Sequence, residues 1–85
     1  MIPIRFKSTH DNFQYEKSDI KNNTARITDD WTKERWDRYN KSTHVIIEHK
    51  KTAKTFVREI RHKCKYQNIV IVTWTPTALQ GSEKK

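Results

Sequence analysis

The sequence predicts an α+β fold: a partly open β-barrel, or a curled antiparallel sheet, of four to five strands with two short helices. Three observations support this class. Apolar and polar residues alternate in several short segments, as half-buried strands require. Two polar segments between them begin with residues that favour helix starts. The 85 residues are 33% hydrophobic and 33% charged, which fits one small core beneath a very polar surface.

The first predicted elements are a strand and a short helix. Ile2 to Phe6 alternates apolar and polar residues, which predicts a strand with one apolar face. A short helix follows over residues 11–17, where Asp11 can act as the N-cap. This helix should turn Phe13, together with Tyr15, toward the core.

A turn, a second strand and a second helix come next. Residues 21–27 are a polar turn followed by an alternating run. Asp29 and Asp30 then put carboxylates where a helix dipole favours negative charge. We therefore predict a helix over residues 31–39.

Three strands are predicted in the C-terminal half. Residues 43–49 alternate, with Val45 and Ile47 on one face. The charged connector 50–54 suits a hairpin turn and leads into a strand from Thr55 to about Lys63.

The third of these strands is the most apolar segment. Residues 69–74 are β-branched and apolar on both faces, which is typical of a strand covered on both sides. The complete order is βαβαβββ. The single glycine lies at Gly81, so bulges and sharp corners are not obvious, which favours a partly open sheet over a closed barrel.

The chain has room for one domain, predicted over residues 1–76, with residues 77–85 as a flexible tail. Cys64 is the only cysteine, which excludes an internal disulfide and fits a reducing cytoplasm. No apolar run resembles a signal peptide or a bilayer span, so we expect a cytoplasmic protein without a membrane partner.

The net charge of +8 favours anionic partners, nucleic acid first and an acidic protein second. Basic residues recur along the predicted hairpin and form a candidate stripe for a nucleic-acid backbone. An alternative is a solvated strand edge that deters aggregation. The stripe consists of Lys50, Lys51, Lys54, Arg58, Arg61, Lys63 and Lys65.

Lys21, Thr24 and Arg26 are the strongest candidates for a ligand site. Thr24 and Arg26 are two residues apart on a predicted strand and therefore project from the same face. Lys21 lies in the turn just before them. An ammonium, a hydroxyl and a guanidinium that converge there could hold an oxyanion, a phosphate or a base edge.

The spacing of these three residues resembles the signature loop of the ASCH family, small relatives of the PUA RNA-binding barrel. That loop reads roughly Gly-x-Lys-x-x-Thr-x-Arg, and Asp19 stands here in place of the glycine. The likeness is closest over the first third of the chain. It implies a PUA-like barrel that binds RNA, single-stranded nucleic acid or a nucleotide, with no cofactor.

The resemblance also raises an enzymatic alternative. Some ASCH proteins are amidohydrolases that remove the acetyl group from acetylcytidine, with a threonine nucleophile, an activating lysine and an assisting glutamate. Thr24 and Lys21 match the first two by position. The helical segment that carries the glutamate has no counterpart here, and Glu48 and Glu59 lie on predicted strands instead. We therefore favour binding over catalysis.

Two further possibilities remain open from the sequence. A small basic protein of this kind could be carried by a virus or mobile element and could bind and inhibit a host protein. A metal site is not supported, because His62 and Cys64 supply only two ligands on one face, and we expect Cys64 to be a small apolar filler. The oligomeric state is not predicted.

Overall fold

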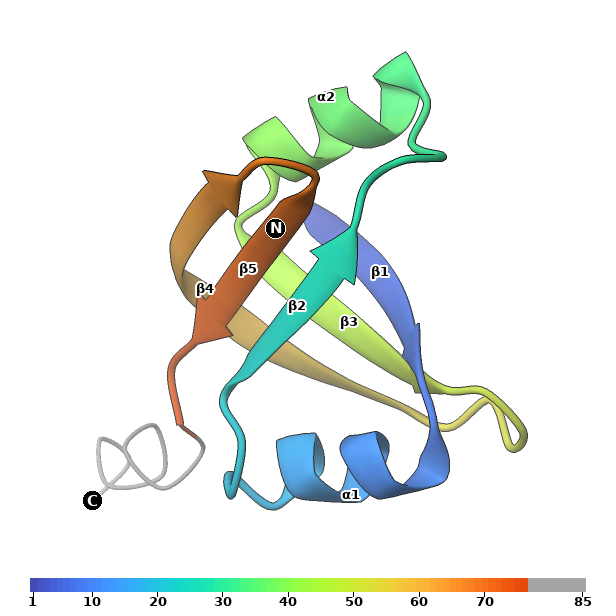
Figure 1. The fold of residues 1–85 in the computed structure, drawn as a ribbon. Coiled ribbons are helices and arrows are strands. Elements are labelled where there is room, and N and C mark those ends of the chain that lie inside the picture. Colours follow the sequence, from blue (N-terminus) through green and yellow to red (C-terminus); the bar gives the residue numbers. More distant parts are fainter. Residues whose placement is uncertain (77–85) are drawn as a thin grey trace.

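The computed structural model describes residues 1–76 and confirms the α+β class and the order βαβαβββ (Figure 1). The tail predicted for residues 77–85 lies outside the described residues. The elements are β1 (Pro3–Ser8), α1 (His10–Lys17), β2 (Asn23–Ile27), α2 (Lys33–Lys41), β3 (His44–His49), β4 (Thr55–Tyr66) and β5 (Ile69–Trp74).

The five strands form one curled sheet in the order β1-β3-β4-β5-β2. The expectation of an antiparallel sheet needs one correction, because β1 pairs with β3 in parallel. The chain makes this pairing through the long crossover that contains α1, β2 and α2, as a parallel pair requires. The outer strands β1 and β2 remain edges, so the sheet is a half-barrel with one helix near each end (Figure 1).

A β-bulge in β4 gives the sheet part of its curl. The pairing with β5 shifts between Ile60 and His62, so that Arg61 is the extra residue. Such an insertion bends a strand and reverses the facing of the residues that follow. Lys63 therefore faces the interior and Cys64 is exposed, which corrects the expectation that Cys64 fills the core.

The core lies inside the half-barrel and follows the alternation of the strands. Its buried members come from every strand except β2 and from both helices. They are Ile4, Phe6, Phe13, Tyr39, Val45, Ile47, Phe56, Val70, Val72 and Trp74, with Trp31, Trp36 and Ile60 packed against them.

The outer face of β5 is not covered as the sequence suggested. Val70 and Val72 are fully buried on the inner face, whereas Ile69 and Ile71 on the outer face are only half-buried. The neighbouring Tyr66 is 69% exposed. Both helices pack at the ends of the half-barrel, so this face of the described sheet stays open (Figure 1).

Helix α2 starts later than predicted because another residue caps it. The Thr32 side chain accepts a hydrogen bond from the Arg35 backbone N–H at 3.1 Å, as an N-cap threonine does. The residues before it are held against the β4–β5 turn. There the Thr28 hydroxyl and backbone N–H both donate to the Asn68 carbonyl.

Candidate functional site

The structure brings Lys21, Thr24 and Arg26 together around one cavity. Thr24 and Arg26 lie on the inner face of β2, where Thr24 is 2% exposed, while Asn23, Ala25 and Ile27 are exposed on the other face. Lys21 joins them from the turn after α1. The cavity measures about 200 Å³, and we call it the site cavity. It is lined by Lys7, Ser8, Thr9, Asn12, Lys21, Thr24, Ala25, Arg26 and Lys50.

Arg26 is held in place by three hydrogen bonds. Its Nε donates to Thr24 Oγ1 at 2.9 Å, and its two terminal nitrogens donate to the Lys7 carbonyl at 2.6 Å and to Ser8 Oγ at 2.9 Å. The guanidinium therefore bridges the edge strands β1 and β2, and it lies 4.9 Å from the centre of the Phe6 ring. A guanidinium has five N–H groups. Two of them find no acceptor in the described part of the chain.

The electrostatic setting of Arg26 comes from burial and from two charged neighbours. Burial lowers the pKa of the Arg26 guanidinium because it removes water from the charged form. The Glu16 carboxylate raises this pKa, and the nearby Arg35 lowers it. An anion in the site cavity would replace part of the hydration that Arg26 has lost.

A buried carboxylate, Glu16, supports the site from behind, and sequence reasoning missed it. Glu16 on α1 is fully buried, its Oε1 accepts a hydrogen bond from Ser8 Oγ at 2.9 Å, and its Oε2 lies 3.7 Å from Lys21 Nζ. Ser8 thus connects Glu16 to Arg26. The Oε2 atom accepts no hydrogen bond within residues 1–76.

Helix geometry explains why Glu16 was missed. The sequence suggested that Tyr15 turns inward beside Phe13, but Tyr15 is 49% exposed. Residues three apart share a helix face, so Glu16 is the residue that follows Phe13 inward. The spacing was available in the sequence, but a glutamate at a core position is rare without a partner on another element.

The turn between α1 and β2 contains a left-handed residue. Asp19 has φ of 67°, a conformation that glycine adopts freely and that Asp tolerates better than most residues. It follows the C-cap residue Ser18, where helices often end in this conformation. The turn directs the chain from α1 into β2 and places Lys21 beside Glu16.

The basic residues of the hairpin divide into two groups. Lys50, Lys51, Lys54 and Arg61 are exposed, as a nucleic-acid stripe needs. Lys65 is also exposed, but its Nζ lies 5.6 Å from the centre of the Trp36 ring.

Arg58 and Lys63 point inward and bind the C-terminal ends of the helices. Arg58 donates to the Lys17 carbonyl of α1 at 3.1 Å. Lys63 Nζ donates to the carbonyls of Tyr39, Asn40 and Ser42 at the end of α2. Burial lowers the pKa of Lys63. These two cations are committed to helix ends, so we remove them from the candidate stripe.

The remaining sequence candidates do not join the site. Glu48 pairs with Arg5 at 2.7 Å on the surface, and Glu59 is exposed on β4. Within residues 1–76, no three His, Cys, Asp or Glu side chains are grouped as a metal site requires. Neither described helix has the length and apolar character needed to cross a membrane.

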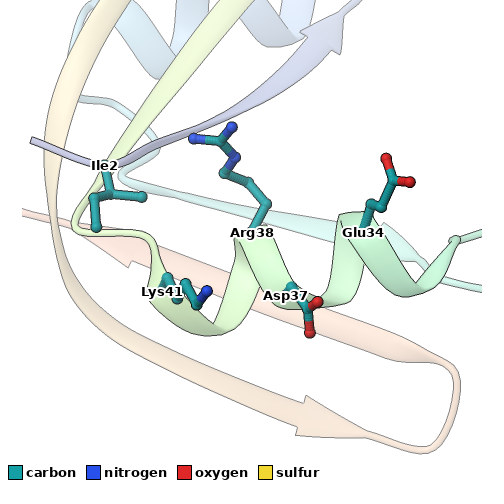
Figure 2. A pocket seen from close by; sticks show the side chains of 5 residues that line it. All are labelled: Ile2, Glu34, Asp37, Arg38 and Lys41. Atoms are coloured by element: carbon teal, nitrogen blue, oxygen red, sulfur yellow. The ribbon is translucent and has the colours of Figure 1, made fainter.

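A larger hollow lies elsewhere, against the solvent face of α2. It measures about 420 Å³ and is lined by Ile2, Glu34, Asp37, Arg38 and Lys41. Figure 2 shows that two acids and two bases project from the helix there, separated from one another rather than directed at a common point. This mixed and exposed surface has no buried polar group, so the smaller cavity is the better candidate.

The fold and the site together define a small α+β half-barrel with a cationic cavity beside its bridged edges. No protein-family model matches the chain, and no curated protein matches it.

Proposed function

We propose that this protein binds RNA, single-stranded nucleic acid or a nucleotide through the site cavity. The observation that carries the proposal is the set of four cations around one small hollow, namely Lys7, Lys21, Arg26 and Lys50. Within residues 1–76, Glu16 is the one carboxylate within salt-bridge distance of any of them, 3.7 Å from Lys21. The excess of positive charge favours an anionic ligand, and phosphate is the anion that every nucleotide carries.

Two features support a specific site over a general basic surface. Arg26 is already fixed by three hydrogen bonds, so its two remaining N–H groups lose little freedom when they bind a ligand. Asp19 has the left-handed backbone that the glycine of the ASCH loop would adopt easily. The departure from that pattern at position 19 is therefore compatible with the same loop geometry, and the resemblance remains part of the proposal.

The test compares single substitutions in fluorescence-anisotropy titrations with a labelled oligonucleotide. Lys7 and Lys54 are both exposed lysines, but only Lys7 lines the site cavity. We expect Lys7→Gln to weaken binding several-fold more than Lys54→Gln, and Arg26→Ala to weaken it at least as much as any hairpin lysine. Equal small losses at all positions would mean that only diffuse electrostatic attraction operates. Failure to bind any oligonucleotide at low salt would refute the proposal and favour an acidic protein partner.

A second candidate function is the hydrolysis of acetylated cytidine. The observation that favours it is the position of Glu16, whose carboxylate lies 3.7 Å from Lys21. Glu16 could therefore take the role of the assisting glutamate, for which Glu48 and Glu59 are not placed. In this scheme Lys21 reacts as the neutral amine: the Thr24 hydroxyl attacks the acetyl carbonyl, Lys21 accepts the hydroxyl proton, and that proton leaves with the cytidine amine. Water then cleaves the acetyl ester on Thr24 and releases acetate.

Chromatographic measurement of cytidine release decides between binding and hydrolysis. Hydrolysis predicts turnover that is lost in Thr24→Ala and strongly reduced in Glu16→Gln. Turnover that persists in Thr24→Ala, or its absence in the unmodified protein, would refute the enzymatic candidate and leave the binding proposal unaffected.

A further inference from the structure

A second hollow adjoins the site cavity. It measures about 280 Å³, lies where α1 begins beside the β3–β4 turn, and is lined by Thr9, His10, Asp11, Lys50 and Lys51. Thr9 and Lys50 line both spaces, so the two hollows are neighbours separated by these side chains.

The hydrogen bonds of His49 determine which nitrogen of His10 can donate. His49 is 5% exposed, and its Nδ1 accepts backbone N–H groups from Lys51 at 3.1 Å and from Thr52 at 3.3 Å. A nitrogen that accepts two hydrogen bonds carries no proton, so neutral His49 carries its proton on Nε2. That proton is donated to His10 Nδ1 across 3.0 Å.

The same reasoning extends to His10. Because Nδ1 of His10 accepts from His49, neutral His10 carries its proton on Nε2. The Phe13 ring packs against the edge of His49 at 5.2 Å between ring centres and holds that imidazole in place. The pair thus leaves the His10 Nε2–H as a donor, and His10 lines the second hollow.

The charges around the second hollow favour an anion. Lys50 and Lys51 are exposed cations on the β3–β4 turn, and Asp11 is the one carboxylate among the lining residues. Two ammonium groups and an imidazole N–H outnumber that carboxylate. A phosphate accepts hydrogen bonds from both kinds of donor.

We propose that the second hollow is an anion subsite, formed by His10, Lys50 and Lys51, for the next phosphate of a strand that occupies the site cavity. The ligand class is then a single-stranded oligonucleotide with at least two phosphates, and not a free nucleoside or mononucleotide. This inference rests on the proposed nucleic-acid function and specifies its ligand.

The experiment measures the binding of two probes at several salt concentrations: a mixture of nucleoside 5′-monophosphates and a mixture of tetranucleotides, as RNA and as DNA. The first two variants are Lys51→Gln and Lys54→Gln. Each removes the charge of one exposed lysine in the same turn region, but only Lys51 lines the subsite. His10→Phe is a third variant that keeps an aromatic ring and removes both nitrogens.

We expect tetranucleotides to bind at least tenfold more tightly than mononucleotides. Lys51→Gln should weaken tetranucleotide binding several-fold. It should also make the dependence of log K on log salt shallower, reducing the magnitude of the slope by about 0.7, the value for one phosphate contact on a single strand. It should leave mononucleotide binding unchanged, and Lys54→Gln should have a smaller effect on both. His10→Phe should also weaken only the tetranucleotide, with folding verified by thermal melting.

Equal affinities for the two probes, or equal effects of Lys51→Gln and Lys54→Gln, would overturn the subsite. If the subsite fails in this way but mononucleotide binding is still weakened by Arg26→Ala, the proposed function stands. If Arg26→Ala weakens the binding of neither probe, the proposed function itself is refuted, so the two failures are distinguishable.

Discussion

Substitution of Arg26 and Arg35 by methionine separates the structural role of a guanidinium from its role in the site. Both arginines reach the open edge of β1, where Arg26 donates to the Lys7 carbonyl and Arg35 donates to the Arg5 carbonyl. Both also lie 4.9 Å from the centre of the Phe6 ring. Methionine retains an unbranched apolar side chain, so each variant mainly removes the charged head group.

The expected magnitudes follow from the hydrogen bonds. Arg26 donates two hydrogen bonds to β1 and one to Thr24 on its own strand, whereas Arg35 donates one hydrogen bond to β1. At about 1 kcal/mol net for each, Arg26→Met should lower the free energy of unfolding by about 3 kcal/mol and Arg35→Met by about 1 kcal/mol. The cation–π contacts with Phe6 are matched and should contribute similarly to both. Arg35 also lies 5.2 Å from the centre of the Trp31 ring, which adds about 0.5–1 kcal/mol to the loss in Arg35→Met. The remaining difference of about 1–1.5 kcal/mol corresponds to about 4–12 °C in Tm for a domain of this size.

Urea unfolding followed by tryptophan fluorescence measures both values, and oligonucleotide anisotropy measures binding. Under conditions where both variants are folded, only Arg26→Met should lose ligand affinity, because Arg35 does not line the site cavity. If the two variants lose equal stability, the bridge between β1 and β2 does not contribute as described. If Arg35→Met weakens binding as much as Arg26→Met, the effect is long-range charge and the site is not specific.

Two further predictions concern α2. Lys63→Met should lower the free energy of unfolding by about 1–2 kcal/mol, because Nζ binds three carbonyls at the helix end; an unchanged urea midpoint would contradict this capping role. Burial raises the pKa of Tyr39, so the unfolded chain loses the phenol proton first. The contribution of Tyr39 to stability is therefore complete below pH 10 and is lost as pH rises through the folded-state pKa. Relative to Tyr39→Phe, the unmodified protein should lose stability above pH 10 in urea unfolding; parallel pH profiles would contradict the raised pKa. The lowered pKa of Lys63 acts in the opposite direction in both proteins and cancels in this comparison.

Much of the strand pattern could be predicted because alternation is a local signal. Val45 and Ile47 are both fully buried, as their spacing indicated, and β5 has the predicted bounds 69–74. The facing of Thr24 and Arg26 also follows from local alternation within β2. These features depend only on neighbours in the sequence, so composition and spacing were sufficient.

Features that depend on pairing between distant segments were not predictable in this way. The bulge at Arg61 needs no glycine, so nothing in the local sequence marked it, yet it reverses the facing of Lys63 and Cys64. The parallel pairing of β1 with β3 is a property of the crossover and not of either strand. The same holds for the site. The burial of Glu16 could not be predicted, because its partners Ser8 and Lys21 lie on other parts of the chain.

The bridge between the edge strands and the candidate site share one residue, and this has a consequence for binding. A guanidinium that was free in solution would lose rotational freedom when a ligand fixed it, but Arg26 is already fixed by Lys7, Ser8 and Thr24. Glu16 holds Ser8 from the opposite side and keeps Lys21 near the same hollow. The half-barrel therefore leaves β1 and β2 unpaired in the backbone and joins them through the Arg26 side chain, which also lines the site cavity. Backbone pairing of β1 with β2 would instead use the Lys7 carbonyl in a main-chain ladder, and Arg26 could then no longer join the two strands through that carbonyl.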